Sequence, residues 1–456
     1  MSVDTEISLE EVLTRTAAAS REWAGRPGAE RADVLRAIAD ALDAAADELV
    51  VTAAEETHLT EPRLRGELRR TTFQLRFFAD AIARGEHLGV YVDHADPDWG
   101  MGPRPDIRRV NEPIGPVLVF AASNFPFAFS VAGGDTASAL AAGCAVIVKA
   151  HSGHPRLSQQ VGAIVAAAGG PVSVITGTEA GRQALQDSRI RAASFTGSIP
   201  GGRALFDIAN SRPDPIPFYG ELGSVNPTFV TRSAAARGED LVKGFIESFT
   251  LGAGQFCTKP GVLFVPADSG LVALLQTAEY PGAAMLLNDR IQSGYVEELT
   301  RLLDHADVAP LVRGSDATPP TPTLALTSIE AVLADPGLIS EVFGPASLIV
   351  TYDDEADLLA VAEALDGQLT ATVHGSDDDA IAPALIRALA DKAGRVLWNQ
   401  WPTGVTVTWA QQHGGPYPAT TSPTSTSVGW TAIFRFLRPV AYQGLPDHLL
   451  PAALRD

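Results

Sequence analysis

Apolar residues recur at helical spacing through the first part of the chain. In residues 31–49 they return every three or four positions, which is typical of an amphipathic helix with one buried face. This period predicts helices over residues 8–60 and again over about 63–84. Residues 90–112 break the pattern, because they are rich in Asp, Pro and Gly and predict a loop or an extended arm.

From residue 116 the pattern changes to short, continuously apolar runs that alternate with helical segments. Such runs predict strands buried on both faces, and the alternation is typical of a parallel, doubly wound α/β sheet. Ligands bind beyond the carboxyl ends of these strands, where Asn124, Lys149, Ser198 and Glu221 fall. The predicted strands are 116–121, 144–149, 171–175, 192–195, 217–219 and 228–230, with helices near 130–142, 157–168, 179–186 and 201–210.

A second α/β pattern covers about 233–410. Residues 411–430 are low in charge and rich in Gly, Pro, Ser and Thr, so we expect an ordered loop there. The tail over 434–442 is suited to adding a strand to a partner. Strands of the second pattern are expected at 262–265, 347–350 and 395–398.

Size and charge exclude several classes of protein. A chain of 456 residues is too long for one ordinary core, so two large domains are expected. The net charge of −20 argues against nucleic acid or an anionic membrane as the main partner. No run approaches the roughly eighteen apolar residues of a membrane span, and residues 1–6 lack a secretory signal pattern. With two distant cysteines and no disulfide framework, the expected location is the cytoplasm.

The two cysteines have different surroundings. Cys257 lies in the glycine-rich, partly polar segment 252–261, where a thiol is poorly placed to fill a core. Glu221 lies 36 positions upstream (257 − 221) in a second tight motif. A thiol and a carboxylate on separate loops indicate covalent catalysis with a base that acts in a later step. Cys144 begins a predicted buried strand, and we expect it to be a small core residue.

The segment 195–202 stands where a dinucleotide fingerprint would lie. It reads Phe-Thr-Gly-Ser-Ile-Pro-Gly-Gly and lacks the Gly-x-Gly-x-x-Gly spacing. Its small residues let a phosphate approach the N-terminus of the following helix. Many strand–helix turns use glycine for geometry only, so this segment alone is a weak signal.

Six motifs in one order resemble the aldehyde dehydrogenase superfamily. The resemblance covers nearly the whole chain, and the motifs are Asn124-Phe-Pro, Lys149, Phe195-Thr-Gly-Ser198, Glu221-Leu-Gly-Ser-Val-Asn-Pro227, Gly254-Gln-Phe-Cys257 and Glu341-Val-Phe-Gly-Pro345. Residues 121–140, 149–155 and 413–421 further resemble the NADP-dependent 2,5-dioxovalerate (α-ketoglutaric semialdehyde) dehydrogenase branch, which also includes NADP-linked fatty aldehyde dehydrogenases.

The resemblance implies three catalytic roles. Cys257 would attack an aldehyde carbon to give a thiohemiacetal, whose oxyanion the Asn124 side chain and the Cys257 amide would hold. After hydride transfer to a nicotinamide, Glu221 would activate the water that hydrolyses the thioester. From the residues alone, Asn124 could be a loop cap and Glu221 a cap or ion-pair partner.

The resemblance also implies the cofactor residues. Lys149 would bond the adenosine ribose. Many NAD-preferring relatives have a glutamate three positions later, and here Ser152 leaves room for a 2′-phosphate, so we favour NADP, with NAD possible. Arg182 is a candidate for the matching charge, or an ordinary surface arginine. His151 and His154 lack further ligands, so no metal is expected. The remaining implied residues are Gly197 and Ser198 for the pyrophosphate, and Glu341 and Phe343 for the nicotinamide ribose.

The implied architecture is an aldehyde dehydrogenase-like α/β fold. A Rossmann-type cofactor domain would take residues 1–98 and 114–232, and an α/β catalytic domain residues 233–418. Residues 99–113 and 419–456 would form an oligomerisation arm and tail, most simply in a homodimer.

The implied reaction is NADP-dependent oxidation of 2,5-dioxopentanoate to 2-oxoglutarate. Alternatives are a fatty or aromatic aldehyde dehydrogenase and an inactive binding or structural protein on the same fold. Related succinic semialdehyde enzymes carry an arginine on the helix after Asn-Phe-Pro, but Gly133 stands there and 121–143 has no arginine. Other candidates to hold a carboxylate are the hydroxyls of Ser422, Thr424, Ser425 and Ser427.

The lining of the aldehyde tunnel is less defined. His413 lies in a Gly-Gly-Pro loop that should line the tunnel, and we expect no catalytic role for it. Phe125, Phe127 and Phe129 line the tunnel or simply pack.

Overall fold

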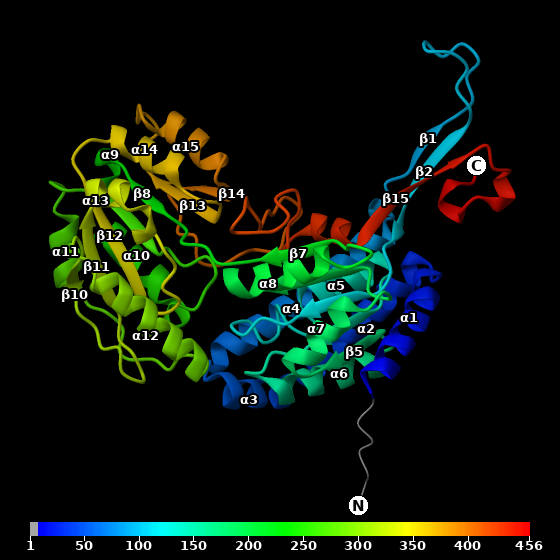
Figure 1. Cartoon of the computed structure of the whole chain (residues 1–456), viewed down its shortest axis with the longest axis horizontal. Coiled ribbons are helices and arrows are strands. Elements are labelled where there is room, and N and C mark those ends of the chain that lie inside the picture. Colours follow the sequence, from blue (N-terminus) through cyan, green and yellow to red (C-terminus); the bar gives the residue numbers. More distant parts are fainter. Residues whose placement is uncertain (1–7) are drawn as a thin grey trace, which may run out of the picture.

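The computed structural model describes residues 8–456 of the chain. Two lobes, each built on a largely parallel sheet, stand side by side, and a third, small sheet projects as an arm (Figure 1). Residues 1–7, including those in which no secretory signal was found, lie outside the described part. None of the helices in residues 8–456 is both long and apolar enough to cross a membrane.

Four helices begin the chain, as the helical period predicted. The N-terminus of the first is capped by Ser8, whose side chain accepts a hydrogen bond from the Glu11 amide. The fourth helix carries a long buried stripe that includes one carboxylate, Glu67. The helices are α1 (Leu9–Ala24), α2 (Gly28–Ala44), α3 (Ala46–Thr57) and α4 (Glu61–Ala83).

The first sheet is parallel throughout, with strand order β5-β4-β3-β6-β7. This confirms the doubly wound pattern read from the sequence. Its strands are β3 (Val117–Phe120), β4 (Val146–Lys149), β5 (Val172–Ile175), β6 (Ala192–Thr196) and β7 (Phe218–Glu221).

Both faces of this sheet are covered, which explains the uninterrupted apolar runs. Successive side chains of a strand point to opposite faces, so Val117 and Val119 pack with α2, α4 and two further helices, while Leu118 and Phe120 pack on the other side with α1. The first group adds α5 (Gly134–Ala142) and α6 (Pro155–Ala167), and the second adds α7 (Thr178–Gln186) and α8 (Ile199–Asn210).

The second sheet has seven strands in the order β10-β11-β12-β9-β8-β13-β14, with only β10 antiparallel. The prediction that residues 228–230 close the first sheet is wrong, because β8 pairs with β9 and β13 in the second. The strands are β8 (Thr228–Val230), β9 (Val262–Pro266), β10 (Ala309–Val312), β11 (Thr323–Ser328), β12 (Ala346–Tyr352), β13 (Gln368–His374) and β14 (Ala393–Trp398).

The pattern of apolar residues did not predict three of these strands, β10, β11 and β13. Buried threonines interrupt the apolar run of β13, where Thr370 and Thr372 are fully buried. The helices of this lobe and its connections are α9 (Arg232–Ala235), α10 (Glu239–Thr250), α11 (Leu271–Thr277), α12 (Asp289–Leu303), α13 (Ile329–Ala334), α14 (Ala356–Ala364) and α15 (Ala382–Ala390).

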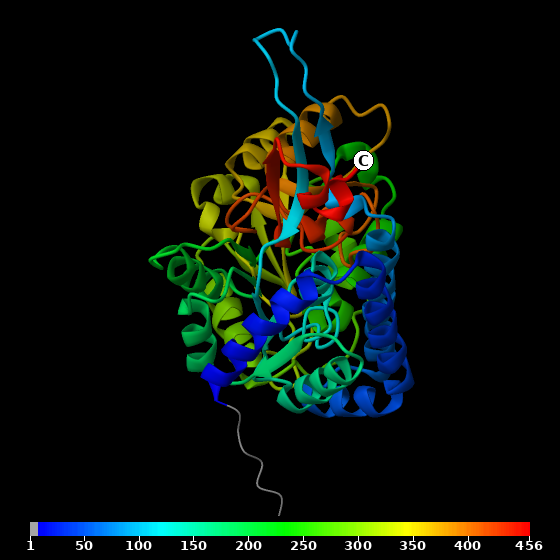
Figure 2. The same ribbon diagram turned by 90° about the vertical axis from the view of Figure 1, so that its right-hand side faces the viewer.

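The arm is an antiparallel sheet of β1 (Tyr91–Asp93), β2 (Ile107–Pro113) and β15 (Leu437–Gln443). It extends away from both lobes (Figure 2). The tail predicted to add a strand thus pairs with β2 of its own chain. Short 3₁₀ helices complete the structure at 86–88, 251–254, 336–338, 430–436, 447–449 and 452–454.

A long connection links the two lobes after β14. Residues 411–429 contain neither helix nor strand, as predicted, and yet much of the segment is buried. It runs along the edge of the first sheet, where the Leu222 amide donates to Ala419 and the Thr421 amide donates to Gly220. This brings residues near 413 and 427 beside the end of β7.

Candidate active site

Four candidate residues lie where the strand pattern placed them, at the carboxyl ends of the first sheet. Asn124 follows β3, Lys149 ends β4, Ser198 follows β6 and Glu221 ends β7. Cys257 comes from the other lobe, in the turn between α10 and β9.

Cys257 directly follows a tight turn over residues 252–254. Gly252, Ala253 and Gly254 have φ values of 58°, 56° and 68°, in the left-handed region that favours glycine. A Cβ atom on Gly254 would clash with the carbonyl oxygen of Gly344, so only glycine allows the two backbones to approach. The thiol turn is therefore packed directly against the segment that carries Glu341.

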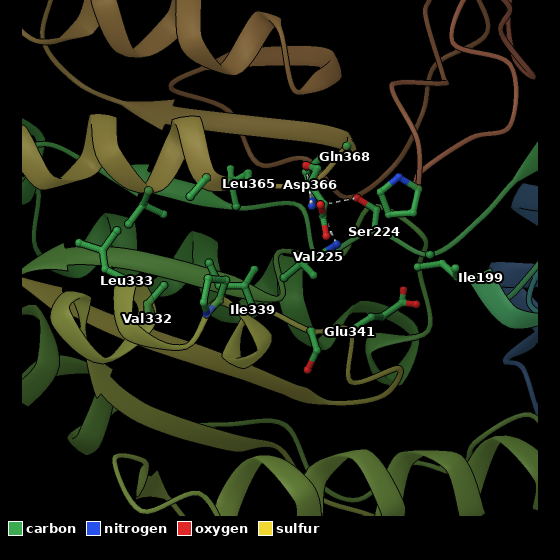
Figure 3. A pocket seen from close by; sticks show the side chains of 17 residues that line it. Ile199, Ser224, Val225, Val332, Leu333, Ile339, Glu341, Leu365, Asp366 and Gln368 are labelled. Carbon is green, nitrogen blue, oxygen red and sulfur yellow. Dashed lines mark hydrogen bonds between the residues drawn. The ribbon is translucent and has the colours of Figure 1, made fainter.

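Side-chain amides fasten this turn to the motif that begins at Glu221. The Asn226 side chain donates to the carbonyl oxygens of Cys257 and Lys259, each at 2.9 Å. Gln368 holds the same motif, since its side-chain oxygen accepts from the Val225 amide at 2.9 Å (Figure 3) and from the Asn226 amide at 3.0 Å. Sequence pattern did not identify Gln368, because it lies in a strand that was missed.

Cys257, His413 and Glu221 form one buried cluster, with one ligand-type atom of each lying within 4.8 Å of the others. His413 Nε2 lies 3.6 Å from Cys257 Sγ and 2.9 Å from Glu221 Oε1, and only the contact to sulfur has the alignment of a hydrogen bond. The Ser427 hydroxyl donates to the other Glu221 oxygen. The expectation that His413 only lines a tunnel is thus incomplete, because its ring lies between the thiol and the carboxylate.

Protonation differs between the two acidic groups. Burial raises the pKa of the Cys257 thiol above its usual range, and the charges of Glu221 and Glu341 raise it further. Burial alone would also raise the pKa of Glu221, but His413, Ser427 and Arg435 outweigh it and lower that pKa. The structure therefore pairs a protonated thiol with an ionised carboxylate.

Asn124 is buried beside this cluster. One N–H of its side-chain amide donates to the Gln255 carbonyl at 3.0 Å, which leaves the second N–H for another acceptor. The main-chain N–H of Cys257 donates to no backbone or side-chain acceptor among residues 8–456. Two donors are thus left without an acceptor, the Cys257 amide and one N–H of Asn124, whose other N–H binds the carbonyl two residues before Cys257.

A cavity of about 280 Å³ opens in front of the thiol. Phe125 and Phe129 line it, whereas Phe127 is 2% exposed and packs in the core of the first lobe. None of the four hydroxyl candidates for a substrate carboxylate lines this cavity. The other lining residues are Arg63, Gly66, Glu67, Arg70, Phe256, Cys257, Thr258, Gly404 and Val405.

Several candidate cofactor residues are more exposed to solvent than the residues around Cys257. Ser152, Arg182 and Ser198 are exposed, and Lys149 is half-buried. Burial and the charge of Arg290 lower the pKa of Lys149. Sequence pattern did not single out Arg290, which approaches from α12 of the other lobe.

The turn after β6 leads directly into the N-terminus of α8. Gly197 is exposed, and its amide donates to the Glu221 carbonyl at 3.0 Å. The Ser198 hydroxyl accepts from the Gly201 amide and caps α8, a helix of 12 residues. The Lys149 ammonium makes no hydrogen bond in the described part of the chain. A free ammonium beside this turn fits a phosphorylated dinucleotide.

A buried lysine shapes the segment that carries Glu341 and Phe343. Lys259 donates from its ammonium to the carbonyl oxygens of Val342, Gly344 and Ala346, at 2.5, 3.1 and 2.7 Å. Burial raises the pKa of Glu341 to about 7 and lowers that of Lys259 to about 8. Phe343, in this segment, is half-buried.

Glu341 lies between the lobes at the edge of a second cavity, of about 220 Å³ (Figure 3). Ile199 of α8 and Ser224 line the same cavity. A Cβ on Gly223 would come within 2.7 Å of the Glu341 carboxylate, so this glycine keeps the carboxylate close to the backbone.

Two other candidate groups are structural. Cys144 is fully buried, and burial raises its thiol pKa to about 11, which confirms a core cysteine. The ring nitrogens of His154 contact Ser158 and the Ala122 carbonyl, while a ring nitrogen of His151 accepts from Gly153.

Comparison with known proteins agrees with this geometry. Residues 2–275 match the aldehyde dehydrogenase family. The chain is 46% identical to α-ketoglutaric semialdehyde dehydrogenase 2 of Azospirillum brasilense, over 95% of this chain and 86% of the relative. It is 43% identical to α-ketoglutaric semialdehyde dehydrogenase of Acinetobacter baylyi, over 94% and 84%.

Solved structures share the fold. Lactaldehyde dehydrogenase of Escherichia coli has a TM-score of 0.82 at 19% identity, covering 95% of this chain and 90% of that one. 3,6-Anhydro-L-galactose dehydrogenase in complex with NADP has a TM-score of 0.80 at 20% identity, with coverages of 95% and 91%. At these identities the likeness shows the fold alone.

Proposed function

The chain belongs to the aldehyde dehydrogenase family, and we propose that it oxidises 2,5-dioxopentanoate to 2-oxoglutarate with NADP. It is an NAD(P)-dependent enzyme that acts on an aldehyde. The observation that carries the proposal is the buried cluster of Cys257, His413 and Glu221 at the end of a cavity. The names of the two relatives support the substrate.

The first step joins sulfur to the aldehyde carbon. Cys257 forms the new C–S bond as the carbonyl π electrons move to oxygen, and the thiol proton passes to a base. His413 Nε2, at 3.6 Å from the sulfur, is the nearest candidate to receive it. The free N–H of Asn124 and the amide of Cys257 hold the developing oxyanion.

Bound NADP would supply the acceptor for the hydride of the thiohemiacetal carbon. We assign its pyrophosphate to Gly197, Ser198 and the N-terminus of α8, and its nicotinamide ribose to Glu341 with Phe343 alongside. Lys259 positions that ribose-binding segment through its three carbonyl contacts.

The last step hydrolyses the thioester. Glu221 removes a proton from water as the water oxygen attacks the acyl carbon, and the C–S bond breaks to release the acid and the Cys257 thiolate. The thiolate takes back the proton held by His413, and Glu221 loses its proton to solvent. The lowered pKa of Glu221 keeps it in the basic form that this step needs.

The choice of NADP rests on charge. Ser152 is exposed where a carboxylate would repel a 2′-phosphate, and Lys149 and Arg290 lie close enough for their charges to interact. Arg182 is exposed on α7 of the same lobe. We assign the 2′-phosphate to these cations, with Ser152 as a hydrogen-bond donor.

A substrate panel tests the proposal. The purified enzyme is expected to form NADPH from 2,5-dioxopentanoate, and the Cys257→Ala variant to form none while keeping its unfolding temperature. Absence of turnover by the wild-type enzyme on any aldehyde with either cofactor would refute it.

A second candidate function has its own support. Four cavity residues, Phe125, Phe129, Phe256 and Val405, are apolar, which favours a longer-chain or aromatic aldehyde. A higher kcat/KM for hexanal or benzaldehyde than for 2,5-dioxopentanoate would favour this candidate. An inactive protein on the same fold is disfavoured, since the thiol, amide and carboxylate are all present.

The assembly also follows from the resemblance and the arm. We propose a cofactor domain over residues 1–98 and 114–232 and a catalytic domain over 233–418, corrected in that β8 belongs to the catalytic sheet and β1 to the arm. We propose that the arm and tail hold a homodimer or a higher homo-oligomer. Trp99 and Met101 at the arm are 47% and 90% exposed, which is unusual for large apolar side chains. A cytoplasmic location stays a prediction from the sequence.

A further inference from the structure

One face of α4 carries charged residues into the cavity that contains Cys257. Arg63, Gly66, Glu67 and Arg70 have the spacing i, i+3, i+4 and i+7, which places them on one stripe of the helix. All four line the cavity. Charged side chains on an inward-facing stripe are costly, so their presence calls for an explanation.

Arg63 is held rigidly with one end free. Its guanidinium donates from Nη2 to the Asn124 carbonyl at 2.9 Å and lies 4.7 and 4.3 Å from the ring centres of Phe125 and Phe256. Its Nη1 is buried and has no hydrogen-bond partner in residues 8–456. A Cβ on Gly252 would come within 2.6 Å of this nitrogen, so the glycine keeps the space beside it open.

Arg70 has even fewer partners. Its guanidinium lies 5.3 Å from the ring centre of Phe129, and the described residues supply it with neither a hydrogen bond nor an ion pair. Burial lowers its pKa, while the charges of Glu67, Cys257 and Glu221 oppose that change. A half-buried cation next to the thiol is thus left without a counter-ion of its own.

Glu67 does not remove this excess of positive charge. One of its oxygens accepts from the amides of Phe127 and Ala128 at 2.8 and 2.9 Å, which anchors the loop after Asn124. The other oxygen lies 3.9 Å from Arg63. The cavity wall therefore presents two guanidinium groups against one carboxylate that already serves the backbone.

We propose that Arg70, with the free Nη1 of Arg63 on the wall of the same cavity, binds the carboxylate of the aldehyde substrate. The inference rests on the proposed function, which supplies a substrate with a carboxylate at one end and an aldehyde at the other. A guanidinium fork matches a carboxylate with two parallel hydrogen bonds, and the flanking aromatic rings would cover the carbon chain. The cavity of about 280 Å³ suits a short chain.

This site replaces the one suggested by sequence. The helix after Asn124 has no arginine at Gly133, and the cation comes from α4 instead. Of the hydroxyl candidates, Ser427 donates to Glu221 and Ser425 donates to the Ser422 carbonyl, so these two groups are already engaged.

The test compares a charged with an uncharged aldehyde. In Arg70→Met, we expect KM for 2,5-dioxopentanoate to rise on the order of 10- to 100-fold, as loss of a charged hydrogen bond predicts. KM for pentanal, of the same length, should change less than about twofold. Arg69→Met is the matched control, because Arg69 is exposed on the same helix. Equal losses on both aldehydes, or no loss on either, would overturn the inference.

Inhibition by glutarate separates this inference from the proposed function. Glutarate should compete with pentanal in the wild-type enzyme, and its Ki should rise at least about 10-fold in Arg70→Met and stay unchanged in Arg69→Met. If 2,5-dioxopentanoate is no substrate but this difference persists, the proposed substrate fails while the carboxylate site stands. If glutarate inhibits Arg70→Met as strongly as the wild type, the carboxylate site fails whatever the substrate is.

Discussion

The proposed catalytic centre and the proposed cofactor face both lie at the carboxyl ends of the first sheet, with Cys257 supplied by the other lobe, yet they are built differently. Around Cys257, the polar groups are buried and contact one another, as Glu221 does with His413 and Ser427. On the cofactor face, Ser152 and Arg182 are exposed and carry no such contacts. The polar side chains of the first region already contact one another, whereas the Lys149, Ser152 and Arg182 side chains of the second make no hydrogen bond among the described residues.

The difference has a physical reason. Charge that develops in a transition state is stabilised best by donors that are already oriented and shielded from water. A cofactor that enters and leaves in each cycle needs accessible groups whose contacts can be made and broken. Substitutions in the catalytic centre should therefore lower kcat, and those on the cofactor face should mainly change KM for the cofactor.

Glu221→Gln should give the largest effect. The amide keeps the shape of the carboxylate but cannot take a proton from water, so the thioester should accumulate. We expect a burst of about one NADPH per active site and a steady-state kcat lowered on the order of 10²- to 10⁴-fold. Rapid-mixing absorbance measures both, and an unchanged steady-state rate without a burst would contradict the assignment.

Asn124→Ala should give the second-largest decrease in kcat. It removes the side-chain donor proposed for the oxyanion, and loss of one such donor costs about 10²- to 10³-fold in kcat. KM for NADP should stay within about twofold of wild type. A variant that instead weakened cofactor binding and left kcat intact would break the distinction between the two regions.

The Lys259→Met variant tests whether Lys259 serves cofactor binding or the catalytic centre. The change removes the ammonium that holds three carbonyls of the segment after Glu341. We expect KM for NADP to rise on the order of 10-fold and the unfolding temperature to fall, because buried acceptors lose their partner. Lys243→Met, at an exposed site on α10, is the control and should change neither quantity. A loss confined to kcat would place Lys259 with the catalytic centre.

Ser152→Glu should have the smallest effect. A new carboxylate near the 2′-phosphate should lower kcat/KM for NADP about 5-fold through repulsion in a solvated site, and leave kcat/KM for NAD unchanged or higher. Initial rates with both cofactors measure the ratio. If kcat/KM falls equally with NADP and NAD, Ser152 does not contribute to a preference for NADP.

The spacing of apolar residues along the chain predicted much of the fold, because the strands and helices of the first lobe are short and their apolar residues recur regularly. The strands near 117, 146 and 192 were placed within a residue or two, and with them the ends that carry Asn124 and Ser198. The same spacing could not show which sheet β8 joins, because its apolar residues suit either sheet. It also missed β13, where the buried Thr370 and Thr372 interrupt the apolar run and Thr370 donates to the Asn226 side chain.

The sequence by itself determined the class of chemistry and the residues that carry the family motifs, since Cys257, Glu221 and Asn124 each lie in a recognisable local string. Only the tertiary structure decided what surrounds them. His413 reaches the thiol from 156 positions away, and Lys259 reaches Ala346 across 87. The arginines of α4 enter the substrate cavity from more than a hundred positions upstream of Cys257. Such contacts leave no period in the sequence, because they depend on how two sheets and one buried loop pack together.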